Sequence, residues 1–285
     1  MHERHTQAAH TSHAHTDGSR HPPRCSRPPL FFVRTCALPF VHTRVYCPLF
    51  THACVFSYYE NRKRVLDVCK KIFAGGLVLG TDGNVSERIV GTDLMAIKGS
   101  GIPYDELTVN EIVVCKLDGT RIPGERKPSS EVGLHAGMYL ARSDVNGVVH
   151  THSTYASIIA CCRLDIPCFH YSVAEIAAET DVIKCAKYFT YGTLELAKSV
   201  IEAVGPTRAG CLMANHGQVC VGEDLDAAFY FAMRLENLCL QYAQVLSIGS
   251  SLVLSKEDMD ACRERDKTYG QVEEGGTGHG LGCCK

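Results

Sequence analysis

Residues 147–152, Gly-Val-Val-His-Thr-His, form a short apolar run that ends in two histidines. A run of this kind predicts a buried strand. Residues two apart on a strand face the same side, so His150 and His152 can reach one metal ion. A third histidine, His216 in Asn215-His216-Gly217, would complete a three-histidine zinc site with one position open for substrate. The alternative is that the three do not converge and that His216 is only a turn residue.

A carboxylate stands upstream of this run, in Ser129-Ser130-Glu131. Beside a metal ion it can act as a general base. Taken alone, Glu131 has a simpler interpretation. Ser129 or Ser130 is expected to cap a helix that continues to about Ala141. A glutamate in the first turn of a helix is stabilised by the helix dipole, by about 0.3–1 kcal/mol.

Helix and strand patterns interleave along the rest of the chain without a regular βα alternation. We therefore predict an α/β fold with a central mixed, largely antiparallel sheet flanked by helices. Asp118-Gly119 is a hairpin turn signal. The predicted strands are 85–90, 94–98, 112–117 and 147–152, with a hairpin over 210–221. The predicted helices are 59–79, 129–141, 154–162, 193–204, 224–248 and 255–267.

Seven separated blocks between about Tyr59 and about Glu274 carry a further pattern. They are Gly83-Asn84-Val85-Ser86, Gly99–Tyr104, Lys127–Glu131, Val148–His152, Ile166-Pro167 with His170-Tyr171, Asn215-His216-Gly217 and Lys267–Gly270. In this order they resemble class II aldolases of the L-fuculose-phosphate aldolase type, in the class II aldolase and adducin-head family. The resemblance implies a three-layer α/β/α fold. We place one domain over residues 58–275 and a flexible tail over 276–285.

The resemblance also implies a role for each residue singled out. His150, His152 and His216 would bind Zn²⁺, and Glu131 would be the catalytic acid/base. Tyr171 would donate a proton into the site of a neighbouring subunit, which implies a homotetramer, and Tyr269 would close over the site. The phosphate would be held by backbone N–H groups and hydroxyls. The implied phosphate-binding residues are Gly83, Asn84, Ser100, Gly101, Ser129 and Ser130.

The implied reaction is zinc-dependent cleavage of a ketose 1-phosphate, similar to L-fuculose 1-phosphate. Its products would be dihydroxyacetone phosphate and a small aldehyde, formed through a metal-stabilised enediolate. Lys98 and Lys127 are Schiff-base alternatives, although the sequence shows no desolvated setting for either. The segment 173–188, which would border the aldehyde pocket, leaves the sugar undecided.

Three other functions of the same family remain open. They are a sugar-phosphate 4-epimerase, a methylthioribulose-phosphate dehydratase and a non-catalytic, adducin-like scaffold. The epimerases carry His-Ala-Asp where this chain has His170-Tyr171-Ser172. A scaffold would not need three histidines and Glu131. The aldolase is therefore the function we favour.

Charge and cysteine content restrict the partners and the compartment. The chain has 285 residues and a formal net charge of −2. Residues 1–57 hold six Arg, no Lys and two acidic residues, which leaves 23 basic and 29 acidic residues in 58–285. That body, with a net charge of −6, argues against nucleic-acid binding. Sixteen scattered Cys without Cys-x-x-Cys indicate free thiols in a reducing, cytoplasmic compartment.

The first 57 residues differ in composition from the rest. They hold eight of the fourteen His and six of the eleven Pro, which predicts a disordered extension. The apolar stretch from Leu30 is broken by Arg34 and Pro39, so we expect no membrane span. The Arg-rich, acid-poor composition resembles a mitochondrial transit peptide. The alternative is an unselected extension ahead of the real start.

Overall fold

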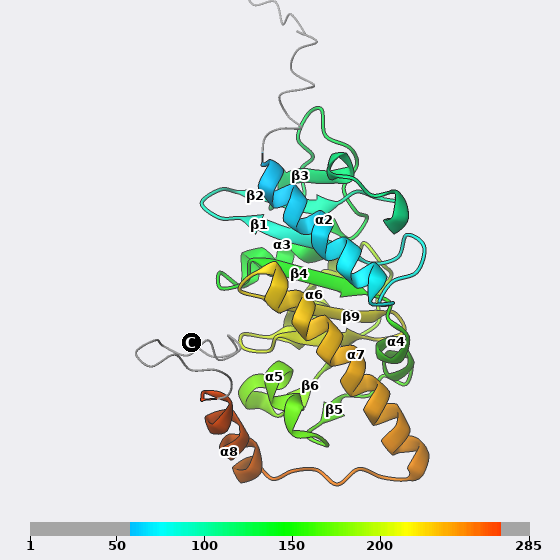
Figure 1. The fold of residues 1–285 in the computed structure, drawn as a ribbon, viewed down its shortest axis with the longest axis vertical. Helices are drawn as coiled ribbons and strands as arrows, with labels where there is room; N and C mark the ends of the chain where they lie inside the picture. Colours follow the sequence, from blue (N-terminus) through cyan, green and yellow to red (C-terminus); the bar gives the residue numbers. More distant parts are fainter. Residues whose placement is uncertain (1–57, 269–285) are drawn as a thin grey trace, which may run out of the picture. The chain divides into compact units, whose positions relative to one another are not determined.

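The computed structural model describes residues 58–268, and a seven-stranded sheet lies at their centre (Figure 1). Its strands are β1 (Asn84–Ile89), β2 (Leu94–Lys98), β3 (Ile112–Lys116), β4 (Gly147–Thr151), β7 (Cys185–Ala186), β8 (Gly210–Met213) and β9 (Gly217–Gly222). The order across the sheet is β3-β2-β1-β4-β9-β8-β7. Every neighbouring pair is antiparallel except β7 and β8, which are parallel.

Helices cover both faces of this sheet. One face carries α2 (Tyr59–Ala74), α4 (Thr154–Cys161) and α7 (Leu225–Ile248), and the other carries α3 (Val132–Ala141) and α6 (Leu194–Val204). Successive residues of a strand face opposite sides, so Val149 packs in the first core cluster and Val148 in the second. Figure 1 shows α2 and α7 crossing the near face. The predicted three-layer α/β/α fold is confirmed.

Short elements complete the described part of the chain. The two-stranded sheet of β5 (Ile166–Pro167) and β6 (Val182–Ile183) is antiparallel. The remaining helices are α5 (Ala174–Ala177), α8 (Lys256–Asp266) and the 3₁₀ turns η1 (Tyr104–Glu106), η2 (Val109–Glu111), η3 (Tyr171–Val173) and η4 (Ala178–Thr180). No helix within residues 58–268 combines the length and apolar character needed to cross a bilayer.

The starts of the two C-terminal helices follow the sequence signals. The Asp224 carboxylate accepts the backbone N–H of Ala227 at 2.8 Å, so α7 begins at the next residue. The Ser255 hydroxyl accepts the N–H of Asp258 at 3.1 Å, and α8 begins directly after it. Both are N-caps that satisfy otherwise unpaired donors.

The predicted start of the third helix is wrong. Ser129 and Ser130 do not cap it; α3 begins at Val132, with Glu131 as its first flanking residue. Ser129 instead donates its backbone N–H to the carbonyl of Lys98 at 3.1 Å, and its hydroxyl accepts the N–H of Glu131 at 3.3 Å, before the helix begins. The helix predicted over 59–79 also ends early, at Ala74, because Gly75 ends it and Gly76 has a positive φ of 69°.

Several predictions concern residues that the structure does not describe. The extension over 1–57, the tail over 276–285 and the catalytic tyrosine Tyr269 all lie outside residues 58–268. The domain boundary at 275 also stays a prediction. Within the described residues, all ten cysteines are free and six of them are buried.

Candidate active site

Three histidines converge at the end of β4. His150 is on that strand, His152 follows it directly, and His216 lies in the turn between β8 and β9. The Nε2 atoms of His150 and His152 are 3.1 Å apart. The ring centroids of the three imidazoles are 4.6 to 4.9 Å from one another. Because β4 pairs with β9, the sheet itself brings the third histidine to the other two.

Close backbone contacts make this approach possible. A Cβ atom on Gly217 would lie 2.3 Å from the carbonyl oxygen of Thr151, so only glycine lets the hairpin meet β4 here. A Cβ on Gly83 would lie 2.6 Å from the carbonyl oxygen of His150, and Gly83 has a positive φ of 72°. Two glycines of the sequence blocks therefore pack their backbones directly against the histidine strand.

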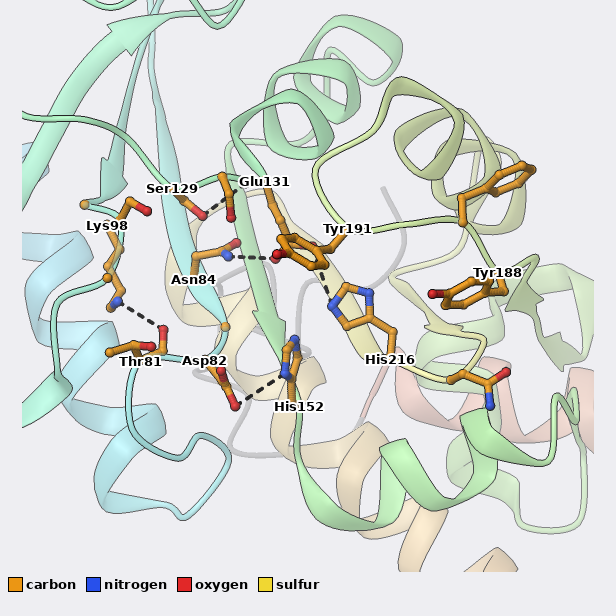
Figure 2. Close-up of a pocket in the computed structure, with 17 residues that line it drawn as sticks. Thr81, Asp82, Asn84, Lys98, Ser129, Glu131, His152, Tyr188, Tyr191 and His216 are labelled. Carbon is orange, nitrogen blue, oxygen red and sulfur yellow. Dashed lines mark hydrogen bonds and ion pairs between the residues drawn. The ribbon is translucent and has the colours of Figure 1, made fainter.

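A hydrogen bond and a longer ionic contact orient two of the imidazoles. His150 is fully buried, and its Nδ1–H donates to the backbone carbonyl of Gln218 at 2.8 Å. This leaves Nε2 of His150 facing the other histidines and Glu131. His152 turns its Nδ1 toward the Asp82 carboxylate, at 3.7 Å (Figure 2). A partner on one ring nitrogen fixes which nitrogen can bind a metal.

Glu131 faces the same centre from the start of α3. Its Oε2 lies 3.1 Å from His150 Nε2 and accepts the side-chain N–H of Asn84 at 3.0 Å. Its Oε1 lies 3.6 Å from His216 Nε2 and has no hydrogen-bond partner. One ligand atom from each of Glu131 and the three histidines fits within 4.8 Å of all the others.

The charges in this cluster suit a cation. Burial, followed by the positive charge of His150, lowers the pKa of His152 to about 4 and that of His216 to about 3. Both imidazoles are therefore neutral near pH 7. Burial alone would raise the pKa of Glu131, but His150, then His216 and Asn84, hold it well below its usual range. For His150, burial works against the charged form, yet Glu131 beside it raises the pKa.

A pocket of about 460 Å³ opens in front of the cluster (Figure 2). It is lined by Glu131, His152 and His216 and by all six residues predicted to bind phosphate. Two of the loops that carry those residues are tied together, since Ser100 donates its backbone N–H to the carbonyl of Lys127 and Ser129 donates to that of Lys98, both at 3.1 Å. The sequence places them in three separate stretches, and the sheet gathers them on one wall.

The chain is similar to known aldolases over most of its length. The family described as Class II Aldolase and Adducin N-terminal domain matches residues 63–243. The 5-deoxy-D-ribulose 1-phosphate aldolase of Bacillus thuringiensis is 36% identical over 212 residues, which are 74% of this chain and 98% of that protein. The L-fuculose phosphate aldolase of Escherichia coli is 36% identical over 214 residues, covering 74% and 97%. This chain belongs to the class II aldolase family.

Solved structures of this aldolase family share the fold. An L-fuculose 1-phosphate aldolase matches with a TM-score of 0.68 at 34% identity, over 73% of this chain and 96% of its own. The relatives of this chain are aldolases by name. This confirms the expectation of an enzyme in the metal-dependent aldehyde-lyase class.

The cluster of Glu131, His150, His152 and His216 fits a metal ion by the chemistry of its donor atoms. Three imidazoles and one carboxylate are the ligand types that Zn²⁺ prefers. The unpartnered Oε1 of Glu131 is buried, and a buried carboxylate oxygen without a donor is costly unless a cation or a proton reaches it. The identity of the metal is a separate question, because these ligands also suit other divalent ions.

The structure does not bring Tyr171 into this pocket. Tyr171 begins η3, is 54% exposed, and stacks on His170 with ring centroids 4.6 Å apart. It is not among the residues that line the pocket of its own subunit. This position leaves the side chain more than half exposed, and the predicted role in a neighbouring subunit needs such exposure.

Sequence reasoning missed several residues of the pocket. The sequence singles out Lys98 only as a Schiff-base alternative, but it ends β2, lines the pocket with the loops predicted to bind phosphate, and is 2% exposed. Its Nζ lies 4.7 Å above the Tyr104 ring, and burial lowers its pKa. The sequence signal that could identify Lys98 as a pocket residue is its place at the end of an otherwise apolar strand. Tyr188 ends the segment predicted to border the aldehyde pocket, and it does line the pocket. The other residues missed are Thr81, Asp82, Gly99, Phe189, Tyr191 and Asn215.

Proposed function

We propose that this protein is a zinc-dependent aldolase that cleaves a ketose 1-phosphate to dihydroxyacetone phosphate and a small aldehyde. One observation carries the proposal. The His150, His152, His216 and Glu131 cluster shares a pocket with the loops of Gly83, Ser100 and Ser129. The cluster that could bind a metal ion next to the carbonyl of the sugar thus faces the groups that suit its phosphate.

The phosphate end of the pocket suits a dianion. Loop N–H groups and serine hydroxyls donate hydrogen bonds to phosphate oxygens, and Lys98 adds a positive charge on the same wall. In our proposal Asn84, Ser100, Gly101, Ser129 and its neighbours hold the phosphate. They thereby place the carbonyl of the sugar beside the histidines.

The other end of the pocket carries the chemistry. His150, His152 and His216 would hold the metal ion. When bound, the ion supplies a Lewis acid for the negative charge that develops as the carbon–carbon bond beside the carbonyl breaks. Glu131 is ionised and lies next to the histidines, so it can take and return the proton at the reacting carbon and oxygen. Tyr171 of a neighbouring subunit would protonate the leaving side, which makes the active unit an oligomer, in our proposal a homotetramer.

Three ketose 1-phosphates are the first substrates to test. The relatives are named for L-fuculose phosphate and for 5-deoxyribulose 1-phosphate. A relative from Rhodospirillum rubrum, 37% identical over 209 residues that are 73% of this chain and 92% of that protein, is named for 5-methylthioribulose 1-phosphate as well. The aldehyde parts of these sugars differ, and the aromatic residues Tyr188, Phe189 and Tyr191 line the pocket.

A coupled assay for dihydroxyacetone phosphate tests the proposal. The full chain is incubated with each of these three ketose 1-phosphates and, as a control, with the unphosphorylated ketose. We expect release of dihydroxyacetone phosphate from at least one phosphorylated sugar and none after treatment with a chelator. An epimerised sugar, or a dehydrated product without dihydroxyacetone phosphate, would assign the site to the epimerase or the dehydratase instead. No turnover of any substrate by metal-loaded protein would favour the scaffold.

A further inference from the structure

A row of buried polar side chains runs from Glu131 into the protein, away from the pocket. Asn84 donates to Glu131, and the Asn84 side-chain oxygen contacts His135 Nε2. On the other side of the ring, His135 Nδ1 is 2.6 Å from the Ser86 hydroxyl, which is 2.7 Å from the Tyr139 hydroxyl. His135, Ser86 and Tyr139 are buried and do not line the pocket.

Two regular spacings build this row. Glu131, His135 and Tyr139 are four residues apart, which places them on one face of α3. Asn84 and Ser86 are two apart on β1 and therefore face the same side of the sheet. The row is the line along which that helix face packs against that strand.

The hydrogen-bond direction can be worked out from the Glu131 end. An ionised carboxylate only accepts hydrogen bonds, so Asn84 must turn its amide nitrogen toward Glu131. The carbonyl oxygen of Asn84 then faces His135, and an oxygen can only accept. His135 Nε2 must therefore carry a hydrogen and donate it to Asn84.

The far side of the row fits the same direction. Burial lowers the pKa of His135 to about 3, so the ring is neutral and its Nδ1 has a lone pair. The Ser86 hydroxyl donates to that lone pair, and the single hydrogen of the Tyr139 hydroxyl is shared between the Ser86 hydroxyl at 2.7 Å and the Ser86 carbonyl at 2.8 Å. All donors point one way, from Tyr139 through Ser86, His135 and Asn84 to Glu131.

We propose that His135 is a positioning residue, which holds the Asn84 amide with both N–H groups toward Glu131 and the substrate. This inference rests on the proposed function, which assigns Glu131 and the phosphate loops their roles. One Asn84 N–H is used by Glu131. The other has no partner among the described residues, and Asn84 lines the pocket, so it is available to an anionic substrate. A reversed amide would present an oxygen to both the carboxylate and the phosphate.

Two substitutions at position 135 separate positioning from packing. His135→Met introduces an apolar side chain of similar length and so removes the donor to Asn84. His135→Gln keeps an N–H that can reach the same oxygen. We expect kcat/KM of the Met variant to fall by about 10–100-fold, the range seen when a hydrogen-bond partner behind a site is removed. The Gln variant should recover part of that loss at an equal or lower thermal stability.

Binding of dihydroxyacetone phosphate to the metal-loaded protein, measured by calorimetry, gives a readout that does not depend on turnover. We expect weaker binding for His135→Met, partial recovery for His135→Gln, and unchanged metal content in both. This readout also distinguishes the two proposals. If the wild type neither cleaves a ketose phosphate nor binds dihydroxyacetone phosphate, the proposed function is wrong. If the wild type does both and His135→Met matches it, the role of His135 is wrong.

Position along the row supplies a second test. Ser86→Ala removes the donor that selects the His135 tautomer, whereas Tyr139→Phe leaves that donor in place. We expect the loss of kcat/KM to decrease from His135→Met to Ser86→Ala to Tyr139→Phe. Losses that instead follow the melting temperatures of the three variants would show a packing role and overturn the proposal. If His135→Met does not fold, the contrast between Ser86→Ala and Tyr139→Phe decides the question.

Discussion

Two walls of the same pocket are built differently. The rear wall, which we define as Asn84 and Glu131 together with His150 buried behind them, is joined by hydrogen bonds and short contacts. The front wall, which we define as Asp82, Tyr188 and Tyr191, is open, and Tyr191 is 68% exposed. His152 lies between the two walls, near His150 on one side and Asp82 on the other.

In the proposed function, the buried rear wall carries out the reaction and the open front wall recognises the substrate. Groups that must act on one bond need a fixed geometry, and burial with hydrogen bonding supplies it before the substrate arrives. Exposed side chains are free to be covered by a substrate or by a second subunit. We therefore expect large effects on turnover from the rear wall and smaller effects from the front.

The largest effect is expected where the walls meet, at His152. His152→Ala removes one of three imidazoles and should abolish metal binding. A Lewis-acid metal stabilises the transition state by several kcal/mol, so the rate should fall about 10³-fold or more. The measurement is metal content and ketose 1-phosphate cleavage, with His170→Ala, outside the cluster, as the control for metal content. Because residues 1–57 hold eight His, the difference from wild type in the same full chain is the relevant quantity. Unchanged metal content in His152→Ala would refute the ligand assignment.

Glu131→Gln tests the rear wall alone. It preserves the shape of the side chain but removes the proton-transfer group, so turnover should fall by about 10²–10⁴-fold while metal and fold are retained. Glu195 is the matched control, since it is an exposed glutamate in the first turn of α6. Glu195→Gln should leave turnover unchanged. Equal rates for both variants would make Glu131 an ordinary helix-start residue.

Tyr171 tests whether a second subunit completes the front of the pocket. Tyr171→Phe and His152→Ala should each be nearly inactive alone. Mixing them with subunit exchange should restore part of the activity, because some sites then combine an intact Tyr171 with an intact histidine cluster. If mixed assemblies form and remain inactive, Tyr171 does not act across an interface.

The smallest effect is expected at Asp82 in the front wall. Its carboxylate is 3.7 Å from His152 Nδ1, and its side chain is 56% exposed, so water competes for the contact. Asp82→Asn should weaken metal affinity toward the lower end of about 10–100-fold, as measured by chelator competition. Asp93→Asn, at an exposed aspartate beside Lys116, is the control. An affinity equal to wild type would leave the front wall without a part in holding the metal.

The sequence predicted the rear wall better than the front. His150, Glu131 and Asn84 occur in blocks with a recognisable spacing, and the structure gathers all three. Their catalytic roles stay predictions. Tyr188 lies at the end of the segment predicted to border the aldehyde pocket. Tyr191 follows the short strand β7 in a loop with no periodic pattern, so nothing local marks it as a pocket residue. Lys98 was considered for the wrong reason, because its burial depends on how β2 meets the phosphate loops.

Sequence alone determined the family, the fold class and the same-face pairs, such as His150 with His152. These follow from backbone periods of two on a strand and about four on a helix, which are local properties. Only the tertiary structure decided which pairs meet. Three arrangements join residues that are far apart in the chain. They are the register Asn84↔His150 between β1 and β4, the packing of α3 against β1, and the pairing of β9 with β4. Such contacts depend on strand order and packing of the whole sheet, and no local pattern encodes them.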